Sequence, residues 1–205
     1  MKKIKQIDLD LLINNHNLYI NSIIKNTVEG KRLILDEIDF SDNDLTQLNF
    51  LDVYITDSKF DNMTFNNKNF GGAKLYGCEF NNISFNDVNF GKVEIDSCKI
   101  SNSTFNNCTL LKLSSNESLF ENSFFNNCKL DDVFSGSIIK NITFEQCIFN
   151  GVEFWESIIS NITFKNTKFD FTTSIRSINK GTLENPIIIN DDEAIIFFRN
   201  QSMIV

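Results

Sequence analysis

Proline, histidine and tryptophan are almost absent from this chain of 205 residues, which contains one of each, and glycine occurs only eight times. Because Pro and Gly mark most tight turns, their scarcity argues against a fold of many hairpins and long loops. The lone histidine, His16, has no visible acid, nucleophile or second ligand, so we interpret it as a packed structural residue. The sequence indicates no cofactor and no metal site.

Basic residues are also in deficit, since 19 Lys and Arg against 27 Asp and Glu give a formal net charge of −8. Direct nucleic-acid binding is not expected, because neutralising phosphates takes a basic surface. No apolar run approaches the roughly 18 residues of a membrane span, and residues 1–30 contain no secretory h-region. We therefore expect a cytoplasmic protein that does not bind membranes.

Phenylalanine, in contrast, is abundant, with 21 copies. A large apolar residue falls on every fifth position from Leu35 to Leu130, except at Ser115, and again from Phe134 to Phe169, and 17 of these 28 positions are Phe. A smaller residue, often Ser, Cys or Val, lies two positions before most of them. Neither a helix nor a strand has a period of five, so the pattern indicates a repeat architecture with two inward side chains per unit.

A longer period overlies the short one. Similar hexapeptides, from NMTFNN at 62 to NITFKN at 161, recur with spacings of 20, 20, 20, 19 and 20 residues. Four units of five therefore make one coil, and 28 units make seven coils. The spacing of 19 coincides with a step of four residues at 131–134.

The units resemble those of the pentapeptide-repeat proteins, with a large apolar centre and a small residue two positions before it, over residues 33 to 169. The resemblance implies an all-β solenoid: a right-handed quadrilateral β-helix of about seven coils, with an N-terminal α-helical cap and a short C-terminal helical segment. We predict three parts: a cap at 1–30, the β-helix at 31–170 and a closing segment at 171–205. Because some members of the family dimerise through their C-terminal segment, the resemblance also implies a homodimer.

The two ends of the tube need covers, because an open coil would expose apolar side chains. Residues 8–24 have helical periodicity, with Asp8 as the predicted N-cap and an inward face listed as Leu9, Leu12, Ile13, His16, Ile20, Ile23 and Ile24. At the other end we predict a helix that contains residues 193–200 and is capped by Asn190 or Asp191. Its run 195–198 is too apolar for solvent and should cover the end of the core or a second subunit.

Stacked coils arrange the large residues in internal columns. One column is predicted to be an aromatic ladder of Phe65, Phe85, Phe105, Phe125, Phe144 and Phe164, and an outer ladder of Asn62, Asn82, Asn102, Asn122, Asn141 and Asn161 should line one edge. All five cysteines fall on the small inward position, so we interpret them as structural thiols. Ser115 replaces a large core residue, which predicts a distorted coil, and the missing residue at 131–134 predicts a tighter corner.

Two sets of outward residues are candidates for binding a partner. Residues 36–61 hold eight acids against one base, and the acidic set comprises Asp36, Glu37, Asp42, Asp44 and Asp52. This end is either a solvated surface or an electrostatic contact for a basic partner. The aromatic set comprises Tyr54, Tyr76 and Trp155, which either mark a binding face or are ordinary scattered surface residues.

The sequence does not predict an enzyme, because it shows no convergent acid, base and nucleophile. We predict a rigid protein-interaction scaffold with an unknown protein partner. The alternative comes from the resemblance: some pentapeptide-repeat proteins protect DNA gyrase by presenting a rod with the size and charge of duplex DNA. The rod and its acidic first coils favour this alternative, whereas the near-neutral later coils and the lack of a long inserted loop oppose it.

Overall fold

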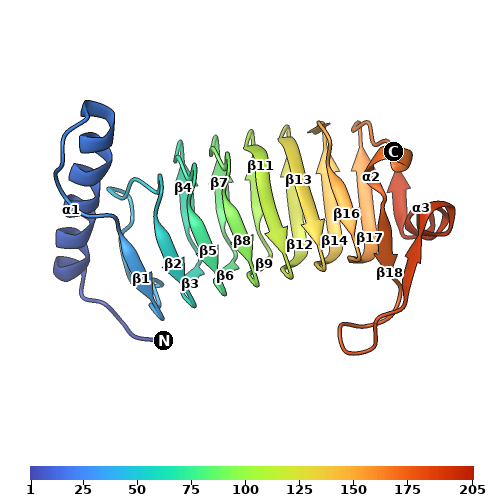
Figure 1. Ribbon diagram of the computed structural model, residues 1–205, viewed down its shortest axis with the longest axis horizontal. Helices are drawn as coiled ribbons and strands as arrows, with labels where there is room; N and C mark the ends of the chain where they lie inside the picture. The colour runs from blue at the N-terminus through green and yellow to red at the C-terminus, as the bar shows by residue number, and fades with distance from the viewer.

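A computed structural model describes residues 1–205, and it is a parallel β-solenoid of about seven coils with a helix at each end (Figure 1). One eight-stranded sheet contains β1 (Ile34–Asp36), β2 (Tyr54–Thr56), β5 (Lys74–Tyr76), β8 (Glu94–Asp96), β11 (Thr109–Asn116), β13 (Lys129–Ser135), β15 (Ile148–Phe149) and β16 (Glu153–Trp155). A ten-stranded sheet contains β3 (Lys59–Asp61), β4 (Thr64–Asn66), β6 (Glu79–Asn81), β7 (Ser84–Asn86), β9 (Lys99–Ser101), β10 (Thr104–Asn106), β12 (Leu119–Asn126), β14 (Ile138–Glu145), β17 (Ile158–Lys165) and β20 (Ser202–Ile204).

Three helices and a short hairpin complete the chain. The helices are α1 (Gln6–Lys25), α2 (Phe171–Ser174) and α3 (Asp191–Asn200), and the antiparallel pair is β18 (Ser177–Asn179) with β19 (Ile188–Asn190). Figure 1 shows α1 outside the first coil and α3 beyond the last strands, so the two helices lie at opposite ends of the rod. The predicted solenoid class with its two helical ends is confirmed.

Adjacent coils are aligned with an offset of 20 residues, as the five-residue pattern predicts. Phe105 pairs with Phe85 on one side and with Phe125 on the other, and all three are buried. Their rings stack at centroid distances of 4.8 and 4.3 Å. The column continues through Phe144 to Phe164 with the same stacked geometry, so the aromatic ladder runs through the middle of the tube.

The corners explain why so few Gly and Pro residues are needed. The residue two positions after most large core residues has positive φ, as in Asn62, Asn82 and Asn102, with φ of 55°, 55° and 52°. Asn tolerates this left-handed conformation better than most residues with a Cβ.

The predicted outer ladder of asparagine side chains is interrupted. Asn82 donates a hydrogen bond to Asn62, but Asn102 donates instead to Asn81, at 2.8 Å. It resumes from Asn122 to Asn161.

The small inward residues join neighbouring coils by hydrogen bonds. Ser118 accepts a hydrogen bond from the Cys98 backbone N–H and donates to the Ile95 carbonyl, each at 3.0 Å. Cys98 makes the equivalent thiol contact with the Leu75 carbonyl at 3.2 Å. The small position thus satisfies backbone groups that would otherwise be buried without a partner.

The N-terminal helix differs from the prediction at its start and at its buried face. It begins at Gln6 after an N-cap at Lys5, so Asp8 lies in the first turn and is not the cap. The buried set is narrower than predicted and comprises Leu9, Ile13, His16, Ile20 and Ser22, whereas Leu12, Ile23 and Ile24 are exposed. Only one narrow stripe of α1 is therefore buried against the rest of the chain.

At the C-terminal end, α3 covers the last coil with Ala194 and Phe198, which are fully buried. Ile195 and Phe197 are partly buried against the core, whereas Ile196 is 59% exposed, so only part of the apolar run 195–198 covers the end of the core. The sequence analysis also missed β20, which adds to β17 in parallel after the helix ends. The chain therefore closes its last coil with both a helix and an extra strand.

The missing residue at 131–134 is a corner residue. Leu111 pairs with Asp131 and Leu113 pairs with Asp132, which leaves Lys112 without a partner. Lys112 has φ of 57°, whereas no residue at 131–134 has positive φ. The corner between Asp131 and Asp132 has therefore lost its left-handed residue. The register of β11 against β13 shifts at Lys112, which lies in the coil of Ser115, the coil predicted to be distorted.

Candidate partner-binding surface

The acidic candidates lie together at the N-terminal end of the rod. Asp36 ends β1, Glu37 and Asp52 are left-handed residues with φ of 57°, and Asp42 and Asp44 lie in the turns of the first coil. This is the end that α1 covers (Figure 1). The acidic candidates therefore lie around the rim of the cap.

Much of this acidic charge is paired by basic residues from elsewhere in the sequence. Lys2 lies 3.4 Å from Glu37, and Lys3 lies 2.9 Å from both Asp39 and Asp42, because the first residues of the chain pair with residues 37–39. Hydrogen bonds from Ser41, together with Lys3, hold the pKa of Asp39 below its usual range. Counting all of residues 1–61 gives 11 acids and 7 bases, a net charge of −4, so the end is less acidic than the count over 36–61 suggests.

The aromatic candidates are only partly brought together. Tyr54 and Tyr76 contact each other edge to face, with centroids 5.6 Å apart at 82°. Arg32 lies over the Tyr54 ring at 5.9 Å. Trp155 is on the same sheet but on β16, far along the rod, where its indole N–H donates to Glu153 at 2.9 Å.

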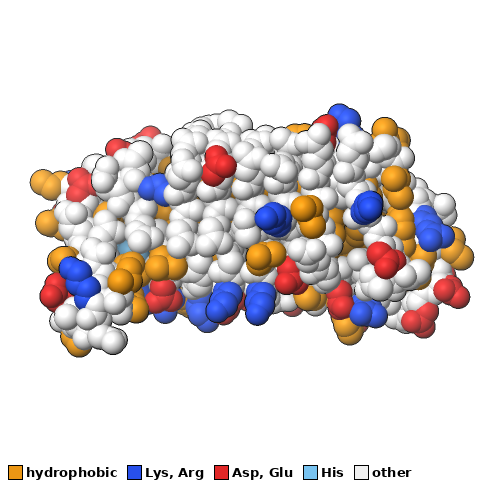
Figure 2. Space-filling view, turned by 90° about the horizontal axis from the view of Figure 1, so that it is seen from above, with side chains coloured by type: hydrophobic (Ala, Val, Ile, Leu, Met, Phe, Trp, Pro, Cys, Tyr) orange, Lys and Arg blue, Asp and Glu red, His pale blue; other side chains and the backbone are white.

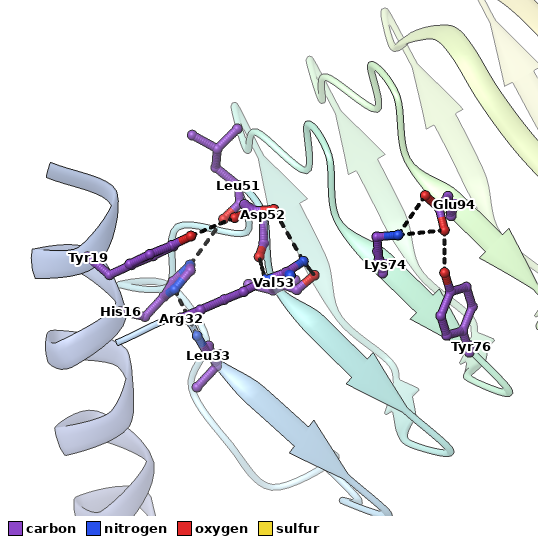
Figure 3. A network of polar contacts seen from close by, with 10 residues as sticks. All are labelled: His16, Tyr19, Arg32, Leu33, Leu51, Asp52, Val53, Lys74, Tyr76 and Glu94. Carbon is purple, nitrogen blue, oxygen red and sulfur yellow. Dashed lines mark hydrogen bonds and ion pairs between the residues drawn. The ribbon is translucent and has the colours of Figure 1, made fainter. Parts of the chain in front are cut away.

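Polar contacts fix Tyr76 and Arg32, the two neighbours of Tyr54 (Figure 3). Arg32 forms an ion pair with Asp52 at 3.2 Å and also donates to the Asp52 carbonyl. On the next strands, Glu94 accepts hydrogen bonds from the Tyr76 hydroxyl and from Lys74, with Lys74 Nζ 2.9 Å from Glu94 Oε1. The Tyr76 hydrogen bond and then Lys74 lower the pKa of Glu94. Both tyrosine rings are thus part of an ordered, mixed-charge surface.

His16 lies behind this surface and is fully buried. Its Nδ1 accepts a hydrogen bond from the Leu33 N–H at 3.0 Å, so the proton is on Nε2, which donates to the Leu51 carbonyl at 3.1 Å. Burial lowers the pKa of His16. The ring fastens α1 to the first coils, and this geometry agrees with the structural interpretation (Figure 3).

The five cysteines are all free and buried. Cys128, for example, directs its thiol toward the Phe105 carbonyl at 3.3 Å. Contacts with the Cys108 and Cys147 thiols, and burial, raise the pKa of Cys128, whereas the contact with Cys128 lowers the pKa of Cys108 and of Cys147. The five thiols thus share burial and not one direction of pKa shift.

The sequence analysis missed one buried charged residue, Asp132. It occupies the small inward position two residues before Phe134, so the five-residue pattern could have identified it. Its carboxyl group lines a narrow cavity of about 20 Å³ inside the tube, where the other lining residues are apolar. Ser115 donates to Oδ2 at 3.0 Å, and Oδ1 has no partner. Burial raises the pKa of Asp132 well above its usual value.

Charged side chains are not gathered by sign on the face of the rod seen in Figure 2. Figure 2 shows acidic and basic side chains interspersed along the face in view. No group of three or more His, Cys, Asp and Glu side chains is placed to bind a metal ion. No helix has the length and apolar character needed to cross a membrane.

Comparisons with known proteins agree with this geometry. Residues 54–91 match the family model described as pentapeptide repeats, in eight copies. No curated protein matches the sequence. Similar solved structures include a trypsin-treated form of QnrB1, a plasmid-mediated fluoroquinolone resistance protein, at 15% identity over 70% of this chain and 77% of that chain, with a TM-score of 0.31. They also include Rfr23, a pentapeptide-repeat protein from the cyanobacterium Cyanothece 51142. Its identity is 13% over 57% of this chain and 91% of that chain, with a TM-score of 0.31.

Proposed function

This chain is a pentapeptide-repeat protein, and on that premise we propose that it acts as a rigid, non-enzymatic scaffold that binds a protein partner. The observation that carries the proposal is the single core of 50 buried apolar residues that extends through every coil. Side chains in such a core are close-packed, so the outer faces keep a fixed spacing. A surface fixed in this way loses little entropy when a partner binds.

The partner surface that we favour is the tyrosine face, which we define as Arg32, Tyr54, Lys74, Tyr76 and Glu94. Tyr and Arg are enriched among the residues that dominate binding energy in protein interfaces. Here both tyrosine rings are partly exposed. Arg32 lies over the Tyr54 ring, and Glu94, which also pairs with Lys74, accepts a hydrogen bond from the Tyr76 hydroxyl. A partner could therefore use these rings without first ordering them.

A quantitative affinity purification from the host tests this proposal. Wild type, Tyr54→Ala and Tyr76→Ala serve as baits, and Trp155→Ala is the matched control, since it removes an exposed aromatic residue elsewhere on the same sheet. We expect one protein that wild type and Trp155→Ala enrich and that both tyrosine variants lose. If every protein bound by wild type is bound equally by the tyrosine variants, the tyrosine face is not the binding site.

A second candidate function is protection or inhibition of a type II topoisomerase such as DNA gyrase. It is supported by the elongated shape and the net charge of −8, and by the fluoroquinolone resistance named for the similar QnrB1 structure. The pairing of Lys2, Lys3 and Arg32 with the acidic end weakens it. A supercoiling assay with gyrase and a fluoroquinolone tests it, comparing wild type with a variant neutralised at Asp36, Glu37, Asp42, Asp44 and Asp52. Protection that the variant loses would support DNA mimicry, and no effect of wild type would remove this candidate.

The homodimer implied by the family resemblance is a further part of the proposal. Its support is a set of exposed apolar residues in the closing segment: Ile187, Ile196, Met203 and Ile204. Sedimentation of Met203→Gln/Ile204→Gln against wild type tests it, because these exposed changes should weaken association without unfolding the chain.

A further inference from the structure

The outward side of α1 carries apolar residues that no part of the chain covers. Ile7, Leu11 and Leu18 are 69%, 66% and 49% exposed. Figure 1 shows α1 as the outermost element at the N-terminal end of the rod, with its axis across the rod. An amphipathic helix normally hides its apolar stripe, so a second, outward stripe indicates a contact with another molecule.

The outward residues have the spacing of a helix-pairing seam. Ile7, Leu11, Asn14, Leu18, Asn21 and Lys25 follow one another at intervals of four, three, four, three and four residues, and all are exposed. This alternation is the heptad pattern of helices that pack side by side. The inward stripe of Leu9, Ile13, His16 and Ile20 is separate and is already used against the first coil.

We propose that this outward seam pairs with α1 of a second copy of the chain, in antiparallel orientation. In the register that overlaps the apolar residues, Ile7 of one copy lies opposite Leu18 of the other, and Leu11 lies opposite Asn14. The three apolar residues of the seam are then buried in each helix, whereas the other exposed apolar residues of α1, Leu12, Ile23 and Ile24, lie outside the seam. The interface is isologous, as expected for a symmetric dimer.

The charges of α1 favour this occupant and this direction. Asp8 and Asp10 lie at the start of the helix and Lys25 at its end. A parallel pair would bring four carboxylates together and align the two helix dipoles, whereas an antiparallel pair separates the carboxylates and opposes the dipoles. Residues 1–30 carry a net charge of +1 and residues 1–61 a net charge of −4, so two N-terminal ends repel each other less than two whole chains of −8 would.

Site-specific disulfide formation tests the pairing. All five native cysteines are buried, so an introduced surface cysteine is the accessible thiol. An equimolar mixture of unlabelled Ile7→Cys chains and ¹⁵N-labelled Leu18→Cys chains is incubated in a thiol–disulfide buffer, and the three possible dimers, which then differ in isotope content, are distinguished by mass. We expect the mixed 7–18 dimer to exceed each homodimer about tenfold, because the seam aligns these positions only between copies in opposite directions. Random pairing, or an excess of 7–7 and 18–18 dimers, would overturn the proposal.

Two controls separate the seam from other association. Lys129→Cys places a thiol on an exposed position in the middle of the rod and reports random collision. Leu11→Gln, introduced into both cysteine chains, should reduce the mixed dimer about tenfold, because Leu11 is buried only in the pair. No reduction by Leu11→Gln, with an unchanged melting temperature, would also overturn the proposal. Dimerisation through the C-terminal segment cannot produce the 7–18 crosslink, since it lies at the opposite end of the rod.

Discussion

Ser115 and Asp132 form a buried pair between two consecutive coils, with the Ser115 hydroxyl 3.0 Å from Asp132 Oδ2. Both residues are at least 98% buried, and Oδ1 of Asp132 faces the core without a hydrogen-bond partner. The small Ser115 and the missing corner residue are therefore parts of one irregularity. A large residue at position 115 would occupy the space where the Asp132 carboxyl group lies.

Asp132→Asn should stabilise the protein at pH 7 to 8. The folded-state pKa of Asp132 is raised, so its contribution to stability is present below the unfolded pKa of about 3.9 and is lost as pH rises toward the folded pKa. We expect a gain of about 1–3 kcal/mol at neutral pH that shrinks toward pH 4. Urea titrations at several pH values measure it. Asp131→Asn, on the same strand but partly exposed, is the control and should give little change. A difference between Asp132→Asn and wild type that does not vary with pH would contradict this prediction.

Phe105→Ala should cost about 3–5 kcal/mol, because it opens a cavity in the middle of the aromatic ladder. Asn106→Ala, the next residue on the same strand, points outward and loses only a side-chain bond to Asn86. It should cost far less. Denaturant unfolding of both variants checks the inward and outward assignment, and equal losses would show that the assignment is wrong.

Ser118→Ala should cost about 1–2 kcal/mol, because the Cys98 N–H would be buried without its acceptor. Ser118→Cys should cost less, since Cys98 and Cys78 occupy the equivalent positions of neighbouring coils and contact the equivalent carbonyls. Thermal unfolding of the two variants ranks them. If cysteine were as harmful as alanine, the hydrogen bonds of the small position would not contribute as we describe.

His16→Ala should loosen α1 from the first coils, because the Leu33 N–H and Leu51 carbonyl would lose their buried partner. The folded-state pKa of His16 is lowered, so in wild type its contribution is present above the unfolded pKa of about 6.5 and is lost as pH falls through the folded value. Hydrogen exchange should show faster exchange in α1 and at Leu33 in the variant, and in wild type at low pH. Ile24→Ala, at a position of the same helix that is 76% exposed and lies outside the seam, should leave exchange in α1 nearly unchanged.

Much of the fold could be predicted from the sequence because the period of five dictates which side chains face inward. Phe65 and Phe105 are buried for a reason that is local and repeated. The ion pairs of Lys2 and Lys3 with Glu37, Asp39 and Asp42 could not be predicted in this way, because they depend on how the first residues return to the first coil. The spacing between Tyr54 and Trp155 likewise depends on counting coils along the rod. The exposed stripe of α1 was missed because helical periodicity identifies a buried face but not its width.

The missing corner residue at 131–134 also has a consequence for how such a chain can change in length. Strand residues on both sides of the gap keep their partners, with Leu130 opposite Leu110 and Phe134 opposite Ser115. A residue can therefore be deleted at a corner without changing the phase of the columns that follow, whereas a deletion within a strand would move both inward residues of each later unit of the coil to outward positions. Corners are thus the places where insertions and deletions can accumulate in this architecture while the pattern of buried side chains is preserved.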